Sequence, residues 1–418
     1  EPLVRDGDRV VPVVGLTGEI RAALVVAGGN TALGADEERL IGGFARHLGS
    51  TLELTRVRRD LAEAEERRRA TTEEMLERGV DLLRVCRRCR RCYDQQVEVC
   101  VEDQTILDEP MPFPYRVGGR YRLQRRVAEG AMGTVFRAYD DRLEREVAVK
   151  VIKAEIFNQP AMRTRFERET RAVARIDHPG VVAVFDYGEI SDEGSLYIVM
   201  EWLQGLDLAR VLQLWGAGRP RDVAALVRQA GAGLAAAHAR QLVHRDIKPA
   251  NIFLTPVPGG FRVKILDFGV AKELSRDSKA TQTGMIVGTP RFMSPEQLLS
   301  KPVDARSDIY SLAAVAFQAL TGERLVRAED FAQVLVEVVN QEPPKVSAIL
   351  AQAPRELDVL FARALAKDPE ARPADVEEWA DELADTLDTL HIDRHAWRID
   401  PDPEGAVGTD DEETAVST

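Results

Sequence analysis

Short motifs, most of them with charged residues, follow one another in a fixed order through the middle of the chain. Each motif is common by chance, but the ordered series is not, so we treat the stretch that carries it as one domain. The motifs are Val-Ala-Val-Lys at 147–150, Phe-Glu-Arg-Glu at 166–169, His-Arg-Asp-Ile-Lys-Pro-Ala-Asn at 244–251, Asp-Phe-Gly at 267–269, Gly-Thr-Pro at 288–290 and Ser-Pro-Glu at 294–296.

A glycine-containing turn precedes the series. Residues 127–135 read Val-Ala-Glu-Gly-Ala-Met-Gly-Thr-Val. Gly130 and Gly133 allow a tight turn whose backbone N–H groups can approach phosphates without a Cβ in the way. A hairpin turn explains the same glycines equally well. The turn is not a Walker A loop, because no Gly-Lys-Ser/Thr follows it.

In this order the motifs resemble the catalytic domain of the eukaryotic-like (Hanks-type) protein kinases. The run Gly-Thr-Pro-Arg-Phe-Met-Ser-Pro-Glu-Gln at 288–297 is similar to that of the bacterial Ser/Thr branch. The resemblance covers residues 121–390 and implies an α+β, two-lobed fold. We expect an N-lobe at 121–203 with an antiparallel sheet and one main helix, and a mostly helical C-lobe at 204–390.

The resemblance implies transfer of the γ-phosphate of Mg-ATP to Ser/Thr hydroxyls of protein substrates. Such transfer depends mostly on positioning and on neutralising phosphate charge. By resemblance, Asp246 orients the acceptor hydroxyl and takes its proton, and Lys248 steadies the γ-phosphate. Asp267 and Asn251 are expected to hold Mg²⁺, a hard cation that prefers oxygen ligands.

Nucleotide-binding positions are carried over in the same way. Lys150 is expected to hold the α- and β-phosphates and to pair with Glu169. The first glycine of the family's loop falls on Ala128, so we expect weaker or altered nucleotide binding, not loss of activity. The other expected nucleotide contacts are Gly130, Gly133, Val135, Ala148, Met200 as gatekeeper, Glu201 and Leu203 at the adenine edge, Asp207 at the ribose, and Phe253 under the adenine.

Several charged or aromatic positions are expected to be structural. Asp308 would brace the catalytic loop, and Glu296 would form a buried ion pair with Arg372. His244 and Phe268 are expected to be packing residues.

Regulation is expected to act through the segment after Asp267. Arg245 precedes the expected catalytic aspartate, where a phosphate on this segment could pair with it. Thr281 and Thr283 are the expected autophosphorylation sites; the alternative is that they are solvated loop hydroxyls. A different class of function is an ATP-binding, pseudokinase-like scaffold that signals through its N-terminal segment.

The N-terminal third lacks a diagnostic motif. Two strand-like runs and a helical segment over residues 1–60 resemble the second half of a GAF domain, a partial α/β sensory segment, and residues 61–85 are expected to continue as a connecting helix. Apolar residues recur every three or four positions from Leu40 to Ala64. This spacing fits a solvated connecting helix or a helix that forms a homodimer.

Four cysteines, Cys86, Cys89, Cys92 and Cys100, lie in the segment 86–108. Four thiolates this close can close a tetrahedral Zn²⁺ site, and the segment resembles the zinc-ribbon-like element that precedes some bacterial kinase domains. The alternatives are a redox switch and an inert cluster. Neighbouring arginines are expected to lower the pKa values of the thiols, which favours metal binding or redox chemistry.

The rest of the chain is expected to connect or to stay unfolded. Alternate prolines predict an extended linker at 109–120, and acidic residues predict a disordered tail at 391–418. Lys and Arg number 56 against 69 Asp and Glu, so we expect no nucleic-acid partner. No apolar run predicts a membrane span, and the charged start at Glu1 shows no signal peptide, so we expect a cytoplasmic chain; what precedes residue 1 stays open.

Overall fold

The computed structural model describes most of the chain and divides it into two compact units. The described residues are 9–14, 19–26, 35–130, 133–154, 160–190, 194–268 and 290–399. The first unit comprises Glu1–Leu82 with Pro110–Phe113, and the second comprises Leu83–Glu109 with Pro114–Thr418. Among the helices in the described ranges, none combines the length and the apolar character needed to cross a bilayer.

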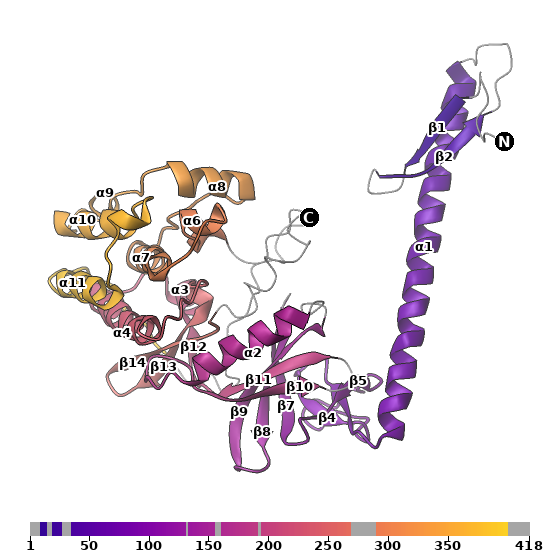
Figure 1. The fold of residues 1–418 in the computed structure, drawn as a ribbon, viewed down its shortest axis with the longest axis horizontal. Coiled ribbons are helices and arrows are strands. Elements are labelled where there is room, and N and C mark those ends of the chain that lie inside the picture. Colours follow the sequence, from indigo (N-terminus) through magenta and orange to yellow (C-terminus); the bar gives the residue numbers. More distant parts are fainter. Residues whose placement is uncertain are drawn as a thin grey trace. The chain divides into compact units, whose positions relative to one another are not determined.

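The first unit contains a hairpin and one long helix (Figure 1). Strands β1 (Arg9–Val14) and β2 (Ile20–Val26) pair antiparallel, and α1 (Ala35–Glu77) follows. The expected order of two strands and a helix is confirmed. The expected boundary at residue 60 falls inside α1, because neither Gly nor Pro occurs from residue 50 to the helix end. Gly79, with φ of 72°, follows the last turn and donates its N–H to the Leu76 carbonyl at 2.9 Å.

An N-lobe sheet of six strands lies in the second unit, in the order β10-β11-β9-β8-β7-β6, with α2 (Pro160–Ala174) beside it (Figure 1). Every neighbouring pair is antiparallel. This arrangement confirms the expected N-lobe. The strands are β6 (Arg116–Val117), β7 (Tyr121–Glu129), β8 (Gly133–Asp140), β9 (Arg145–Ile152), β10 (Val184–Ile190) and β11 (Ser195–Glu201).

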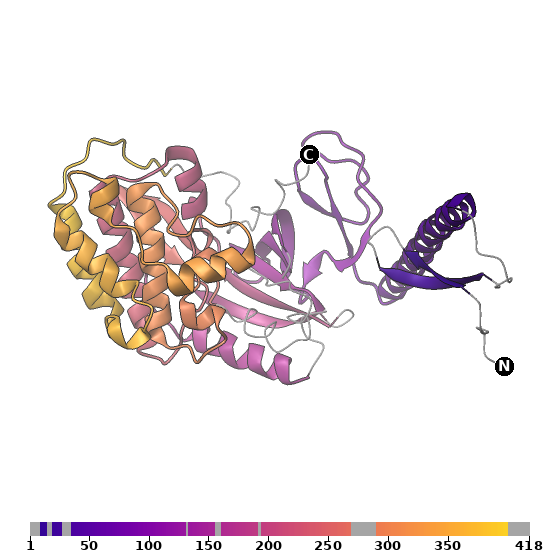
Figure 2. The ribbon, with the colours of Figure 1, turned by 90° about the horizontal axis from the view of Figure 1, so that it is seen from above.

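Helices dominate the other end of the same unit, as the view from above shows (Figure 2). The core runs through α7, whose residues 309–317 are all buried, and α4 packs against α11. The helices are α3 (Leu208–Trp215), α4 (Pro220–His238), α6 (Pro295–Leu298), α7 (Ala305–Thr321), α8 (Phe331–Asn340), α9 (Val346–Ile349), α10 (Arg355–Ala364) and α11 (Val376–Asp388).

A small antiparallel sheet completes the C-lobe. Strands β12 (Leu206–Asp207), β13 (Ile252–Val257) and β14 (Gly260–Ile265) pair in this order. Asn251 ends a single 3₁₀ turn (Pro249–Asn251) directly before β13. The sheet thereby joins the 244–251 motif to the residues that precede Asp267.

Two segments expected to connect or to be disordered are ordered instead. The 109–120 stretch is extended, as its prolines predict, but it supplies β5 (Met111–Pro114) and β6, and β6 extends the N-lobe sheet. Residues 391–399 pack on the C-lobe: Trp397 is buried beside Phe261 and its Nε1–H donates to the Gly216 carbonyl at 3.2 Å. The acids that predicted disorder begin only after this apolar anchor, and 400–418 lie outside the described residues.

Candidate functional site

The motif at 244–251 forms a tight loop around Asp246. The Asn251 side-chain amide donates from Nδ2 to the Asp246 carbonyl at 2.8 Å and to its carboxylate at 3.0 Å. The ammonium of Lys248 lies 3.9 Å from the same carboxylate oxygen. The loop thus brings together the acid, base and amide that the sequence grouped, and it fixes one carboxylate oxygen of Asp246 by hydrogen bonding.

A backbone connection ties this loop to Asp267. Leu266 donates its N–H to the Asn251 carbonyl at 2.9 Å, and the Leu266 carbonyl accepts from His244 Nε2 at 2.7 Å. His244 is fully buried, and burial lowers its pKa, so it is neutral and acts as a packing residue, as expected. Its ring lies 4.6 Å from that of Phe268.

Two non-glycine residues of the site adopt left-handed backbone. Arg245 has φ of 66° and Asp267 has φ of 46°. Such conformations cost about 1–3 kcal/mol each and persist where surrounding contacts fix them. Both stand beside the residues expected to do the chemistry.

Lys150, in β9, forms its ion pair with Asp267: Nζ lies 2.7 Å from Oδ2. The expected Lys150–Glu169 pair is absent between these two described residues. Glu169, in α2, instead accepts from Arg165 Nε at 3.1 Å, one helical turn away. Arg165 lies four residues before Glu169 on the same helix, a spacing at which side chains are neighbours. The motif-based prediction did not consider this partner.

Six of the residues predicted to contact the nucleotide belong to one buried cluster. Val182 and Leu266 belong to the same cluster and were not predicted, since neither lies in a recognised motif. The predicted members are Ala128, Val135, Ala148, Met200, Leu203 and Phe253. An apolar wall drawn from both lobes is what an adenine ring requires.

The glycine turn has the geometry its sequence suggests. Gly130 and Gly133 exchange backbone hydrogen bonds of 2.9 and 3.3 Å. A Cβ on Gly133 would lie 2.0 Å from the Val151 carbonyl oxygen, so only glycine fits there. Residues 131–132 lie outside the described ranges.

Glu201 and Asp207 already have side-chain roles in the fold. The Glu201 carboxylate accepts from Lys264 at 2.5 Å and from the Ala183 N–H at 2.8 Å. Its own N–H donates to the Ala183 carbonyl at 2.9 Å, so the expected contact with the adenine edge falls to the Glu201 carbonyl. Asp207 is buried and caps α3 by accepting the Arg210 N–H at 2.9 Å, and burial raises its pKa. A ribose contact by Asp207 stays a prediction.

The residues expected to hold Mg²⁺ fit that ion by their donor chemistry. Asn251 uses Nδ2 for both bonds to Asp246, so its side-chain oxygen is the atom left for a cation. Asp267 adds a carboxylate, and oxygen ligands of this kind suit Mg²⁺. Asp267 and Asn251 would therefore each offer an oxygen ligand to Mg²⁺.

Two structural expectations are confirmed. Asp308 accepts the backbone N–H groups of His244 and Arg245, both at 2.8 Å. Arg372 pairs with both oxygens of the Glu296 carboxylate at 2.7 and 2.8 Å, and both residues are buried.

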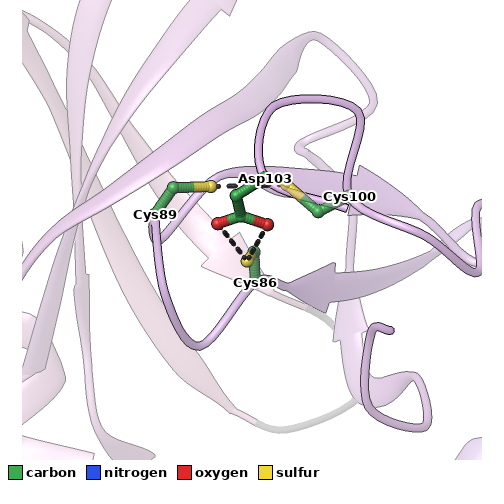
Figure 3. Close-up of side chains that lie close together, drawn as sticks. All are labelled: Cys86, Cys89, Cys100 and Asp103. Atoms are coloured by element: carbon green, nitrogen blue, oxygen red, sulfur yellow. Dashed lines mark hydrogen bonds between the residues drawn. The ribbon is translucent and has the colours of Figure 1, made fainter. Parts of the chain in front are cut away.

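A second cluster of potential ligands lies in the segment between β3 (Leu82–Val85) and β5, which also contains β4 (Cys92–Asp94). One ligand atom from each of Cys86, Cys89, Cys100 and Asp103 lies within 4.8 Å of the others. Figure 3 shows the three sulfurs gathered around the Asp103 carboxylate. Cys86 Sγ is 3.4 Å from Asp103 Oδ2, and the sulfurs of Cys89 and Cys100 are 3.5 Å apart.

These spacings suit a tetrahedral ion. With Zn–S bonds of about 2.3 Å, neighbouring ligand atoms in a tetrahedron lie about 3.8 Å apart. The fourth ligand differs from the one expected: Cys92 is not in the group. Cys92 begins β4, where it pairs with Val85, and it is buried near Arg126. Cys100-x2-Asp103 repeats the spacing of Cys86-x2-Cys89, a signal that could have identified Asp103.

At two of the thiols burial outweighs the contributions that lower the pKa, which are the Arg91 backbone at Cys89 and Arg126 at Cys92. Burial raises the pKa of Cys89 to about 12 and also raises the pKa of Cys92. The expectation that neighbouring arginines lower the thiol pKa values is therefore wrong for these two cysteines. At Cys100, burial opposes ionisation, but the hydrogen bond from Tyr93, at 3.1 Å, contributes to a lowered pKa.

The comparisons with known proteins agree with the kinase-like arrangement. Residues 121–385 match the family model described as protein kinase domain. The chain is 40% identical over 271 residues to serine/threonine-protein kinase PknA of Mycobacterium tuberculosis, aligning 64% of this chain with 61% of that relative. It is 38% identical over 265 residues to PknB of Mycolicibacterium smegmatis, aligning 63% of this chain with 42% of the relative.

A solved structure shows the same fold. The chain superposes on the crystal structure of the PknI kinase domain of Mycobacterium tuberculosis with a TM-score of 0.51 and 31% identity, covering 64% of this chain and 96% of that one. The match lies in the kinase region, and the chain spans 61% and 42% of the lengths of the two curated relatives.

Proposed function

The chain belongs to the protein kinase family, and we propose that it is a serine/threonine kinase that transfers a phosphoryl group from Mg-ATP to protein hydroxyls. The observation that carries this proposal is the loop around Asp246. There Asn251 holds the carboxylate, Lys248 lies 3.9 Å away, and Leu266 bonds the loop to the strand that leads to Asp267.

When bound, Mg-ATP supplies the γ-phosphoryl group. The Asp246 carboxylate would orient the acceptor hydroxyl and receive its proton as the oxygen attacks the γ-phosphorus, while the bond from that phosphorus to the β–γ bridging oxygen breaks and ADP leaves. Lys248 and Lys150 would offset the negative charge of the phosphates. Because these side chains are held in place by the fold, they need not rearrange as the reaction proceeds. Asn251 and Asp267 would hold Mg²⁺. The Lys150–Glu169 pair stays a prediction for the nucleotide-bound chain, since it requires Glu169 to leave Arg165.

The test is phosphate incorporation by the purified chain with Mg-ATP, with the sites mapped by mass spectrometry. We expect Asp246→Asn and Lys150→Met to abolish incorporation. Asp385→Asn, an exposed acid on α11, is the matched control and should keep full activity. Unchanged incorporation in both site variants would contradict the proposal, and ATP binding without any incorporation would favour the scaffold alternative.

Thr281 and Thr283 remain the proposed autophosphorylation sites, although they lie outside the described residues. Arg245, next to Asp246, supports a phosphate-dependent switch by its position in the sequence. Phosphate at either threonine in the wild-type chain, and none in Asp246→Asn, is the expected mass-spectrometric result.

Two further proposals concern the residues before the kinase domain. We propose Zn²⁺ at Cys86, Cys89, Cys100 and Asp103, supported by their mutual distances. We also propose that α1 forms a homodimer, supported by the exposed apolar side chains of Leu40, Phe44, Leu54, Val57 and Leu61. The test is the molar mass in solution. We expect the wild-type chain to have the mass of a dimer, and the Leu54→Lys and Val57→Lys variants to have the mass of a monomer. A cytoplasmic location and a GAF-like sensory role stay predictions.

A further inference from the structure

The cysteine segment lies directly against the strand that enters the glycine turn. This segment, residues 83–109, and β7 belong to the same compact unit. Arg91 forms an isolated antiparallel bridge with Arg125. The Arg126 backbone N–H donates to the Arg90 carbonyl at 2.8 Å, and the Arg90 guanidinium donates to the Val127 carbonyl at 3.4 Å.

The contacting residues are part of the turn that carries two proposed ligands. Cys86 donates its N–H to the Arg91 carbonyl, and Arg90 donates its N–H to the Cys86 carbonyl, both at 2.9 Å. Arg90 follows Cys89 and has φ of 61°, a left-handed conformation that arginine rarely adopts. We call residues 86–91 the knuckle. An ion held by Cys86 and Cys89 would stabilise this strained turn and, with it, the Arg90 carbonyl.

Besides the paired strands β3 and β4 and the buried Leu83 and Val85, the segment has a small apolar core. Its buried apolar cluster consists of Cys86, Cys100 and Leu107, with Cys89, Tyr93 and Val97 partly buried around them. Three of these six residues are proposed metal ligands. Such small units usually need a metal or disulfides to fold.

On β7, the residues that follow the contact belong to the expected nucleotide site. Val127 is followed by Ala128, which belongs to the buried cluster expected to contact adenine. Gly130, two residues further, forms the hydrogen-bonded turn with Gly133. A shift of β7 at Arg126 and Val127 therefore reaches the adenine wall and the phosphate turn within four residues.

We propose that the metal held by Cys86, Cys89, Cys100 and Asp103 controls nucleotide affinity by keeping the knuckle bonded to β7. With Zn²⁺ bound, the Arg90 carbonyl holds the Arg126 N–H and the glycine turn is pre-positioned. Without it, the knuckle relaxes, that bond opens, and nucleotide binding must order the turn anew. This inference rests on the proposed kinase function and on the proposed metal site.

The test compares the full chain with Zn²⁺, after chelation, and after Zn²⁺ is restored. Hydrogen exchange at the Arg126 amide reports the contact, and titration with Mg-ADP reports affinity without requiring phosphate transfer. We expect chelation to speed exchange at Arg126 at least tenfold and to raise the Kd for Mg-ADP at least threefold, with both changes reversed by Zn²⁺.

A matched pair of variants removes one carboxylate each. Asp103→Asn loses a metal ligand yet keeps an oxygen that can accept the Thr105 N–H, as Asp103 does at 3.1 Å. Glu98→Gln removes a nearby exposed charge that belongs to none of the ion pairs described. We expect Asp103→Asn to behave like the chelated chain and Glu98→Gln like the wild type.

Three results are decisive. Metal loss with unchanged Arg126 exchange and unchanged Kd would overturn the inference, as would a chain that takes up no Zn²⁺. If the metal-loaded chain binds no Mg-ADP at all, the proposed kinase function fails, while Arg126 exchange still decides whether the metal holds β7.

Discussion

Asp308 is the single side chain whose loss should most clearly damage both stability and catalysis. It is buried at the start of α7 and faces three donors. Its Oδ2 atom accepts from His238 Nε2 and from the His244 N–H, and its Oδ1 atom accepts from the Arg245 N–H, each at 2.8 Å. No other carboxylate among the described hydrogen bonds holds two successive N–H groups of this catalytic loop.

The expected loss of stability follows from the hydrogen-bond donors that the substitution leaves without an acceptor. An unsatisfied buried donor costs about 1–3 kcal/mol. Asp308→Ala strands the buried His244 N–H and two part-buried donors, which cost less, so the free energy of unfolding should fall by about 2–6 kcal/mol. Asp308→Asn keeps one acceptor oxygen and should cost less. Because total stability is about 5–15 kcal/mol, the alanine variant should be only marginally folded and the asparagine variant folded but weakened.

Urea unfolding followed by tryptophan fluorescence measures this change. Asp304→Asn is the matched control, since Asp304 caps the same helix from the surface and asparagine caps as well as aspartate. In Asp308→Asn we also expect kcat to fall about 10²-fold, because a misplaced Arg245 backbone shifts Asp246. If Asp308→Ala unfolds within 1 kcal/mol of the wild type, the reasoning from stranded donors is refuted.

The other predictions concern single contacts in the second unit. Glu296→Ala should lower the free energy of unfolding by about 3–5 kcal/mol, because it leaves Arg372 charged and buried; a loss below 1 kcal/mol in urea would contradict this. Although burial of Glu296 opposes ionisation, Arg372 keeps its pKa below the usual value. The pair's contribution is therefore present at neutral pH and lost as pH falls through that lowered value, which unfolding midpoints measured from pH 7 to pH 3 should show. Elemental analysis of Cys92→Ala should find one full equivalent of bound Zn²⁺. A variant without bound Zn²⁺ would instead support a site made of the four cysteines. Trp397→Ala should cost about 3–5 kcal/mol, and an unchanged melting temperature would show that the 391–399 segment does not stabilise the C-lobe.

The sequence predicted what its contiguous motifs encode. Asp246, Lys248 and Asn251 lie within six residues of one another, so a local turn suffices to bring them together. The two lobes were predicted because strand-like and helical stretches alternate between these motifs. Such features depend on local patterns that tertiary packing leaves intact.

The missed features depend on distances between separate segments. Asp103 comes close to the cysteines only when the 86–103 loop folds back on itself. Glu169 pairs with Arg165 on its own helix and not with Lys150 on strand β9. The packing of Trp397 depends on Gly216 and Phe261, far away in sequence. Composition suggested disorder for that region because the acids beyond it outnumber its one tryptophan and two isoleucines.

The ordered flanks of the kinase domain decide where this protein can be cut. A fragment limited to 121–385 would remove β6 from the edge of the sheet and expose unpaired backbone groups on β7, an edge prone to aggregate. It would also uncover the apolar surface that Trp397 and Ile399 bury. The smallest fragment we expect to fold by itself therefore runs from about residue 83 to residue 399, which makes the cysteine segment part of the folding unit of the catalytic domain.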